Sequence, residues 1–256
     1  MFSFRFGSAP AWVLSPSMSD YPDAGAVKPE RLWGAETDKA IANFPISGRR
    51  FPLDVIGWLA RLKGAAASVN AEFGLLDDER AQAIQRAAVE IASGRHADQF
   101  PVDVFQTGSG TSSNMNVNEV ISALTGGAAH PNDHVNLGQS SNDVVPTAVQ
   151  LAACAALTGD LLPALDHLIA AIRGKADEFA DVVAPGRTHL MDAVPVLLGD
   201  QFAAFAEQLA ECREQIAGAR PYLARVPLGG TAVGNGLNTH PEFAARVLAR
   251  LDAGVL

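Results

Sequence analysis

The sequence predicts a mainly α-helical protein. Apolar residues make up 48% of its 256 residues and aromatic residues only 7%, a composition typical of closely packed helices. Apolar side chains recur at helical spacing in several segments, and no comparable alternating pattern predicts strands. The clearest helical run steps by four and three residues through Leu198, Phe202, Phe205, Leu209, Cys212 and Ile216. This spacing predicts a long helix in a near-parallel bundle.

Shorter helices are expected in the first half of the chain. Residues 57–69 carry an apolar face at helical spacing. Asp77 is expected to cap a second helix, which Gly94 ends. A third helix follows a polar loop and ends near Gly126.

The predicted helices become longer near residue 139. Pro146 lies early in one of them, where the first turn tolerates proline. A further apolar stripe follows, consisting of Leu161, Leu165, Leu168 and Ile172. We therefore expect an N-terminal helical domain over residues 29–139 and a partial central helical bundle over residues 140–256. Residues 1–28, whose short apolar stretch is broken by prolines, are expected to be a disordered extension.

Charge and composition limit the partners. The formal net charge of −9 argues against nucleic acid and anionic membranes, because both need a basic surface. No apolar run approaches the ~20 residues of a membrane span. Cys154 and Cys212 fall within helical patterns and are expected to be buried free thiols. If the ligand is an anion, its attraction must come from the local pocket.

The most informative segment is residues 107–119, which read TGSGTSSNMNVNE. Glycine lets the backbone approach a ligand closely, and a helix N-terminus offers unpaired N–H groups and a positive dipole end. A single Ser, Thr or Asn would be enough to cap a helix, but this run has many. We interpret it as a binding loop for a small anion.

Two further polar loops precede helices. Residues 139–143 read QSSND, and residues 186–189 read GRTH. Taken alone, the first loop predicts a helix cap rather than a binding site, and a lone His189 is more often structural than catalytic. Three hydroxyl-bearing loops of one character together favour a shared binding site.

Metal and cofactor chemistry is less favoured. His130 and His134 are spaced like metal ligands on a helix, but the intervening Pro-Asn-Asp predicts a turn. The glycine-rich residues 229–234 lack the strand–turn–helix context of a dinucleotide site. We expect an acid–base site that uses no metal and no cofactor.

Five segments, taken in order, resemble the class II fumarase branch of the fumarase/aspartase superfamily. They are FQTGSGTSSNMNVNEVI (105–121), HPNDHVN (130–136), QSSNDVVPTA (139–148), GRTHLMDAVPV (186–196) and GGTAVGNGLNTHPEF (229–243). Residues 31–47 also look like the N-terminal region of that family. The histidine of GRTH is typical of fumarases, whereas aspartate ammonia-lyases tend to carry glutamine there. His134, Asn235 and the pair Asp200–Gln201 depart from the commoner family residues.

The resemblance implies the reversible addition of water to fumarate, giving L-malate. It implies that one group of residues binds the substrate: Ser109, Gly110, Thr111, Ser140, Ser141, Asn142 and Thr188. His189 would be the proton donor and acceptor, acting through water. A secondary dicarboxylate site would consist of His130, Pro131, Asn132 and Asp133.

Family members continue past the position that matches Leu256, with a flexible loop resembling Gly-Ser-Ser-x-Met-Pro-x-Lys-x-Asn-Pro. No such run occurs here. We therefore expect a C-terminally truncated fumarase that is inactive alone. It would associate as a homo-oligomer (a homotetramer in the family) or with a complementary C-terminal half.

The resemblance implies a cytoplasmic enzyme, or a mitochondrial one if the N-terminal tail is a leader. Two alternatives stay open at this point. One is an aspartate ammonia-lyase-type lyase of the same superfamily. The other is a non-catalytic remnant that acts only as a helical association module or a dicarboxylate-binding module.

Overall fold

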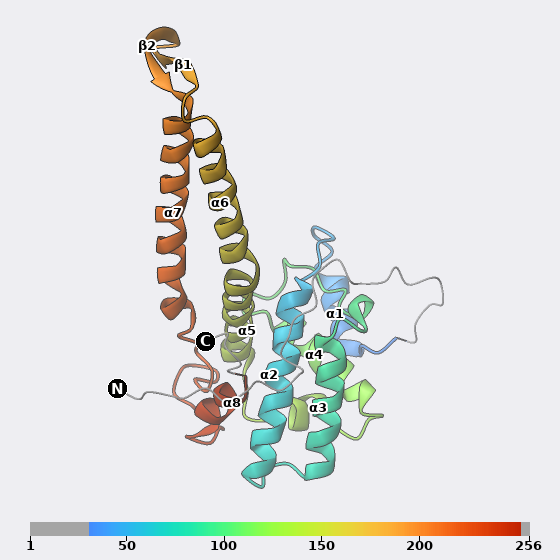
Figure 1. The fold of residues 1–256 in the computed structure, drawn as a ribbon. Helices are drawn as coiled ribbons and strands as arrows, with labels where there is room; N and C mark the ends of the chain where they lie inside the picture. Colours follow the sequence, from blue (N-terminus) through green and yellow to red (C-terminus); the bar gives the residue numbers. More distant parts are fainter. Residues whose placement is uncertain (1–30, 252–256) are drawn as a thin grey trace. The chain divides into compact units, whose positions relative to one another are not determined.

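The structure, a computed structural model, describes residues 31–251. The extension expected over residues 1–28 lies outside the described residues. The described fold is mainly helical, as predicted (Figure 1). Its helices are α1 (Ala35–Asn43), α2 (Leu53–Glu72), α3 (Asp78–Ala92), α4 (Thr111–Leu124), α5 (Ser141–Ala156), α6 (Leu162–Glu178), α7 (Leu198–Leu223) and α8 (Phe243–Leu251). Short helical turns η2 (Ala97–Gln99), η3 (Pro131–Val135) and η4 (Leu157–Leu161) and strands β1 (Val183–Thr188) and β2 (Met191–Leu197) complete it.

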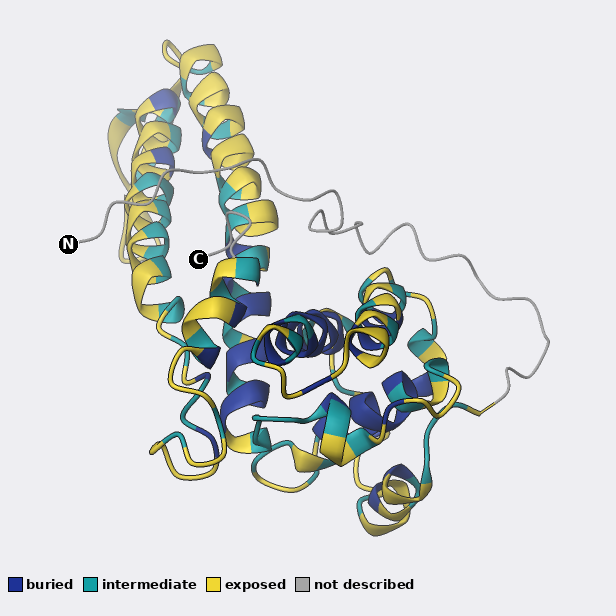
Figure 2. Cartoon of the chain, turned by 90° about the horizontal axis from the view of Figure 1, so that it is seen from below, coloured by how far each residue is buried: buried dark blue, intermediate teal, exposed yellow. Residues whose placement is uncertain are grey.

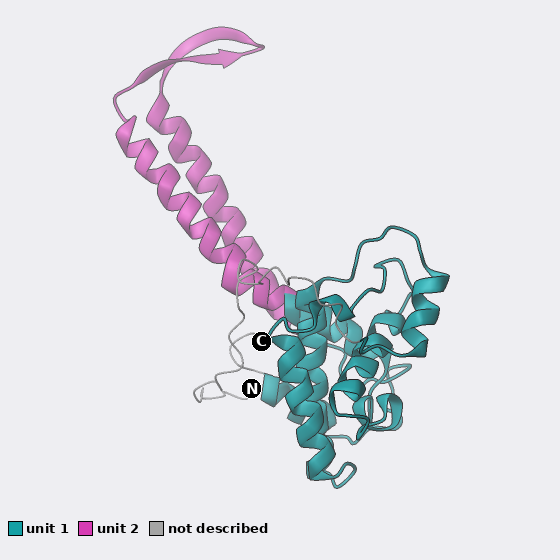
Figure 3. Ribbon diagram, turned by 90° about the vertical axis from the view of Figure 1, so that its right-hand side faces the viewer, with its two compact units in different colours: residues 1–152, 225–256 teal, residues 153–224 magenta. Residues whose placement is uncertain are grey.

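The chain forms two compact units (Figure 3). Unit 1 comprises residues up to Ala152 together with the returning segment from Arg225, and unit 2 comprises residues 153–224. The predicted division into residues 29–139 and 140–256 stays a prediction.

Helix α2 lies at the centre of unit 1. It packs against α3, α4 and α8, and it is buried along most of its length (Figure 2). Its core side chains include Leu59, Leu62 and Val69, which are fully buried. The apolar pattern predicted for residues 57–69 is therefore explained by contacts on several sides of the helix.

The predicted boundaries of α3 and α4 are confirmed. The side chain of Asp77 accepts a hydrogen bond from the backbone N–H of Arg80 at 2.9 Å and caps α3. Gly94 follows this helix with a φ of +82°, a conformation that glycine adopts without steric cost. Helix α4 ends at Leu124, just before Gly126 and Gly127.

Unit 2 contains the end of α5, η4, and the helices α6 and α7, which pack side by side and are joined by a β-hairpin (Figure 1). Both of its cysteines are free thiols, but Cys212 is exposed and only Cys154 is buried as expected. The predicted stripe of α7 is only partly covered. Phe202 and Leu209 are half-buried, whereas Phe205 is 52% exposed. Arg213 of α7 pairs with Asp166 of α6, an exposed ion pair of small energetic weight.

The β-hairpin corrects the expectation that no strand competes with the helices. Strands β1 and β2 are antiparallel, with Val183 opposite Leu197 and an irregularity between Pro185 and Arg187. Pattern reading missed them because apolar and polar residues do not alternate regularly along VAPGRT or MDAVPVL. Most of their side chains are exposed, so the backbone ladder holds the pair together.

One helical stretch has the length and composition of a membrane span. Residues Ser141–Glu178 run continuously through α5, η4 and α6 and include a window of mean hydropathy 1.5, of which 28% is buried. This differs from the expectation that no run approaches that length. Core helices of soluble proteins share these properties, so this is weak support for a membrane, and the absence of a membrane partner stays a prediction.

Candidate functional site

The predicted anion loop forms a tight turn that leads into α4. The backbone N–H of Gly110 donates to the carbonyl of Thr107 at 2.9 Å. Gly110 has a φ of +68° and precedes the first residue of α4, Thr111. A Cβ atom at Gly110 would lie 2.7 Å from Cγ1 of Val145 on α5. The close approach of the loop to α5 therefore requires glycine at this position.

Gln106 caps α4 from outside the helix. Its Oε1 accepts the backbone N–H of Ser113 at 2.8 Å, while its Nε2 donates to the Ser113 hydroxyl and to the carbonyl of Asp103. A first-turn donor of the helix is satisfied in this way without a side chain at the N-cap itself. The cap leaves the Ser109 and Thr111 hydroxyls available for other partners.

Asp103 anchors the base of this loop. Its carboxylate accepts backbone N–H groups of Ser47, Gly48 and Phe105 at 2.7 to 2.8 Å and the hydroxyl of Ser47 at 2.9 Å. Burial alone would raise the pKa of Asp103, but these hydrogen bonds outweigh it and lower that pKa to about 2. The segment before the loop is thus fixed by an ionised carboxylate.

Ser109 and Thr111 form a hydroxyl pair. Their Oγ and Oγ1 atoms are 2.7 Å apart, and either can be the donor. One hydroxyl hydrogen is used between them, so the other O–H can donate to a ligand. The pair is suited to a carboxylate or another small anion.

The start of α5 is a capping arrangement of Ser140 and Asp143. The Ser140 hydroxyl accepts the backbone N–H of Asn142 at 3.2 Å, and Asp143 Oδ1 accepts the backbone N–H of Ser140 at 2.9 Å. These bonds resemble a capping box, except that the serine hydroxyl accepts the N–H of the second helical residue and not that of the third. Ser140 therefore does cap a helix, while its own O–H stays able to donate. Pro146 lies inside the helix rather than in its first turn, which corrects that expectation.

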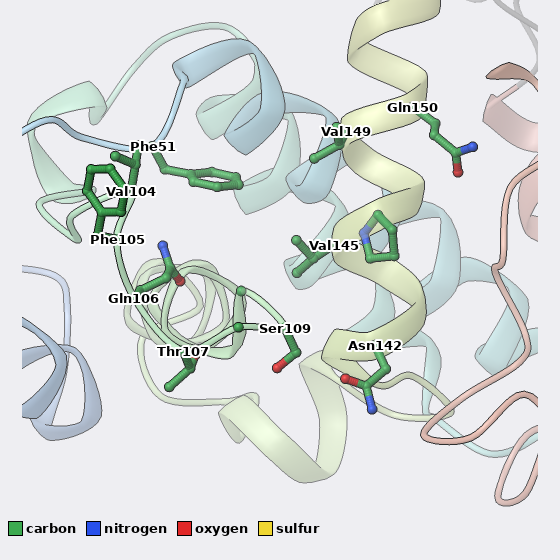
Figure 4. A pocket seen from close by; sticks show the side chains of 13 residues that line it. Phe51, Val104, Phe105, Gln106, Thr107, Ser109, Asn142, Val145, Val149 and Gln150 are labelled. Atoms are coloured by element: carbon green, nitrogen blue, oxygen red, sulfur yellow. The ribbon is translucent and has the colours of Figure 1, made fainter. Parts of the chain in front are cut away.

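The two loops share one pocket of about 820 Å³ within unit 1. Figure 4 shows Ser109 and Asn142 on facing sides of it. Ser109, Gly110 and Asn142 are thus brought together, with an apolar wall beside them. The lining comprises Phe51, Val104, Phe105, Gln106, Thr107, Gly108, Ser109, Gly110, Asn142, Val145, Pro146, Val149 and Gln150.

The glycine-rich segment after unit 2 packs against the start of α5. Buried Asp143 accepts the backbone N–H groups of Gly229 and Thr231 at 3.1 and 2.9 Å. The Asn142 amide donates to the carbonyl of Ala232 at 2.8 Å. This segment has no strand, as expected, and it serves to fix the second polar loop.

A buried lysine contacts the second polar loop. Lys63 of α2 is 0% exposed, and its Nζ donates to Asn136 Oδ1 at 3.1 Å and Gln139 Oε1 at 3.2 Å. Asn114 Nδ2 donates to the same Asn136 oxygen and to the Ser141 hydroxyl at 3.0 Å. Burial lowers the pKa of Lys63 to about 7, against the opposing effect of the Asp143 charge.

The residues predicted as a secondary site form the turn η3. His130 Nδ1 accepts the backbone N–H of Asp133 at 3.2 Å, and His134 Nδ1 accepts the backbone N–H of His130 at 2.8 Å. Pro131 begins the turn. Asn132 and Asp133 are exposed. These four residues are adjacent and accessible, and their role as a dicarboxylate site stays a prediction.

Thr188 and His189 lie in unit 2. Thr188 ends β1, and His189 and Leu190 form the hairpin turn with φ values of +52° and +61°. Both turn residues are exposed, and positive φ is uncommon for residues other than glycine and asparagine. The structure therefore presents His189 on a tight, strained turn.

Three supporting residues were missed by sequence reasoning. Lys63, Gln106 and Asp143 hold the loops through long-range contacts, and only Asp143 had a local signal, because it follows Ser140 at capping-box spacing. Gln106 directly precedes the predicted loop, but no pattern shows that its side chain folds back.

The fold and site define a mainly helical protein in which two polar loops at helix N-termini line one pocket. Residues 25–255 match a lyase family. The chain belongs to this family, and its resemblance to the class II fumarase branch is confirmed by the comparisons that follow.

Class II fumarate hydratases are similar over most of the chain. The enzyme of Xylella fastidiosa is 52% identical over 228 residues, which are 88% of this chain and 48% of that relative. The Mycobacterium tuberculosis enzyme is 52% identical over 230 residues, with 89% and 48% covered. A class II fumarase structure from Schistosoma mansoni matches with a TM-score of 0.84 and 39% identity, covering 88% of this chain and 50% of that one. The chain thus spans about half the length of the relatives it matches.

Proposed function

We propose that the chain carries the substrate-binding loops of a fumarate hydratase, which adds water reversibly to fumarate and gives L-malate. The observation that carries this proposal is the shared pocket of Ser109, Gly110 and Asn142, formed by two polar loops at helix N-termini. The 52% identity to class II fumarate hydratases supports the same reaction.

In this proposal the loops hold the carboxylates of the substrate. Ser109, Gly110 and Thr111 bind one carboxylate through hydroxyl and backbone N–H groups at the start of α4. Ser140, Ser141, Asn142 and Thr188 complete the binding set. In the reverse direction, removal of a proton beside one carboxylate of the malate dianion adds a further negative charge to that carboxylate, and preorganised donors stabilise the charge as it develops.

His189 is proposed to transfer the proton through water. In hydration, the water oxygen bonds to one alkene carbon and His189 accepts the proton that the water releases, while the other carbon takes its proton from a general acid that the completed assembly supplies. Histidine suits this role because its ordinary pKa lies near neutral pH. Proton transfer and charge stabilisation suffice for this reaction, so no metal or cofactor is proposed.

The proposed assembly contains further polypeptide. Because the chain spans about half the length of its relatives, we propose that its partner is a complementary C-terminal half or further copies of a homo-oligomer, such as the homotetramer implied by the resemblance. We propose a cytoplasmic location; a mitochondrial one would require a leader. The secondary dicarboxylate site is proposed to consist of His130, Pro131, Asn132 and Asp133.

The alternatives are less supported. An aspartate ammonia-lyase-type reaction is not favoured, because the similar relatives are named fumarate hydratases. A purely associative remnant is not favoured either, because Ser109 of the first loop and Asn142 of the second line one pocket.

The test follows fumarate absorbance after malate is added to the purified chain. A parallel sample receives the C-terminal half of the Mycobacterium tuberculosis relative. We expect negligible turnover by the chain alone and malate-dependent fumarate formation in the mixture. If ammonia release from aspartate appears instead, the proposed reaction is wrong.

A further inference from the structure

The lining of the pocket has no positive charge. Its polar members are hydroxyl, amide and backbone groups, and none of the lining residues within the described chain is Lys, Arg or His. The protein as a whole has a formal charge of −9. A dianion would therefore meet an unfavourable overall field and a neutral lining. A nearby positive charge would offset both, in addition to the N–H groups at the helix N-termini.

Lys63 is the cation placed to do this. It is fully buried on α2 and reaches the second polar loop through two side-chain carbonyls, those of Asn136 and Gln139. Asn114 links the same Asn136 oxygen to the Ser141 hydroxyl. Because Ser141 Oγ accepts from Asn114, its own hydrogen is left to donate to another partner.

The ammonium has no carboxylate in contact among the residues that the structure describes. Asp143 on α5 acts on it through space, but the Asp143 oxygens already accept backbone N–H groups. From α4, the side chain nearest in this network is the amide of Asn114. From α3, Gln85 and Ala88 lie against Gly64, the residue that follows Lys63.

The remaining elements packed on α2 add little charge near Lys63. On α8, Arg246 and Arg250 pair with Glu72 at the C-terminal end of α2. In η3, His130 pairs with Asp133, and His134 accepts the backbone N–H of His130. A buried cation without a contacting anion is costly. An anion in the pocket would reduce that cost.

We propose that Lys63 is a positioning residue for an anion bound at residues 109–111 and 140–142, acting through Asn136 and Asn114 on the Ser141 hydroxyl and supplying the charge that the lining lacks. The identification of the anion as a four-carbon dicarboxylate rests on the proposed function. The coupling itself does not, because any small anion in this pocket would interact with the same charge.

Binding and protonation are linked by this arrangement. Burial brings the pKa of Lys63 to about 7, so the side chain is partly neutral in the empty protein near that pH. An anion favours the protonated form, and by reciprocity the protonated form binds the anion more tightly. Anion binding should therefore take up a proton near neutral pH.

The experiment is calorimetric titration of the purified chain with succinate, a dicarboxylate that has no double bond to hydrate. Measurements at pH 6 and pH 8 in two buffers of different ionisation enthalpy give affinity and proton uptake. We expect the wild-type affinity to be roughly tenfold weaker at pH 8 and Lys63-dependent uptake of a fraction of a proton per bound anion, larger at pH 8 than at pH 6.

Two variants separate charge from packing. Lys63→Arg keeps its charge throughout this range, so binding should persist and lose its Lys63-dependent proton uptake. Lys63→Met should bind succinate about tenfold or more weakly at pH 6. Lys39→Met is the matched control, because Lys39 is exposed and paired with Glu36. If Lys63→Met does not fold, proton uptake by wild type and its loss in Lys63→Arg decide the matter.

The results also separate this inference from the proposed reaction. Succinate binding with Lys63-dependent proton uptake, but no malate turnover in the completed mixture, would support the inference and reject the function. Malate turnover in the completed mixture that is unchanged in Lys63→Met would support the proposed function and reject the inference. The inference would be overturned if wild type and Lys63→Met bound succinate with equal affinity and equal pH dependence. It would also be overturned if the wild-type chain bound no succinate.

Discussion

The Thr37 hydroxyl on α1 donates to a carboxylate oxygen of Glu119 on α4 at 2.6 Å. The same carboxylate accepts the backbone N–H groups of Gly34, Glu36 and Thr37 at 2.9 to 3.2 Å. A residue distant in sequence therefore caps α1. This explains the glycine at position 34, where a Cβ atom would lie 2.7 Å from Glu119 Oε1.

Glu119→Gln is expected to destabilise unit 1. The amide keeps one acceptor but turns an NH2 group toward backbone donors, which leaves buried N–H groups unpaired. The expected loss in the free energy of unfolding is roughly 2–3 kcal/mol, measured by urea denaturation. Glu36→Gln is the control, because Glu36 is exposed and pairs with Lys39. Equal midpoints for the two variants would contradict the capping role.

Gly110→Ala is expected to disturb the anion loop. The new methyl group would meet Val145 Cγ1 at 2.7 Å, and alanine is strained at a φ of +68°. A loss of roughly 1–2 kcal/mol in the free energy of unfolding is expected. Gly108→Ala is the matched control, because a Cβ atom there meets nothing within 4 Å. Adding Val145→Ala should restore the stability lost through the steric contact, but not the stability lost because alanine is strained at positive φ.

The sequence could predict the helices but not the contacts that hold the site. Helical periodicity located α2 and α7, and Asp77 and Gly94 gave the bounds of α3, because these signals are local. The anion loop was recognisable because its hydroxyls and glycines lie within a few residues. Its meeting with Asn142 across the pocket required the resemblance or the structure.

The sequence could not predict the role of Lys63 or the β-hairpin, for a different reason. Lys63 looks like an ordinary polar position of a helix until Asn136 and Gln139 are placed beside it. The β-hairpin lacks a core, so it left no alternating apolar pattern. Both features depend on contacts or backbone pairing between separated residues, which periodicity does not encode.

His189→Asn is expected to abolish catalysis without loss of the hairpin. Asparagine tolerates positive φ better than most residues, so it suits the φ of +52° found here, but it does not titrate near neutral pH. On the proposed mechanism, kcat in the completed mixture should fall by about 10²–10⁴-fold. Leu190→Gly, which changes the next turn residue without removing a proton-transfer group, is the control. Full activity of His189→Asn would remove His189 from its proposed role.

The buried lysine also predicts how stability depends on pH. Lys63 has a pKa of about 7 in the folded chain, against the ordinary 10.5. Between these values the unfolded chain binds more protons, so the free energy of unfolding should rise with pH by up to about 1.4 kcal/mol per pH unit. Below about pH 7 both states are protonated, and this contribution to the slope disappears.

Lys63→Met should flatten that rise. The slope is the useful quantity, because methionine also leaves the Asn136 and Gln139 carbonyl oxygens without their lysine donor, which shifts stability at every pH. Urea denaturation at intervals from pH 6 to pH 10 measures it. Lys39→Met should keep the wild-type slope, since burial opposes the charge of Lys39 only weakly and its pKa is raised by Glu36. A wild-type slope in Lys63→Met would mean that Lys63 stays protonated in the folded chain throughout this range.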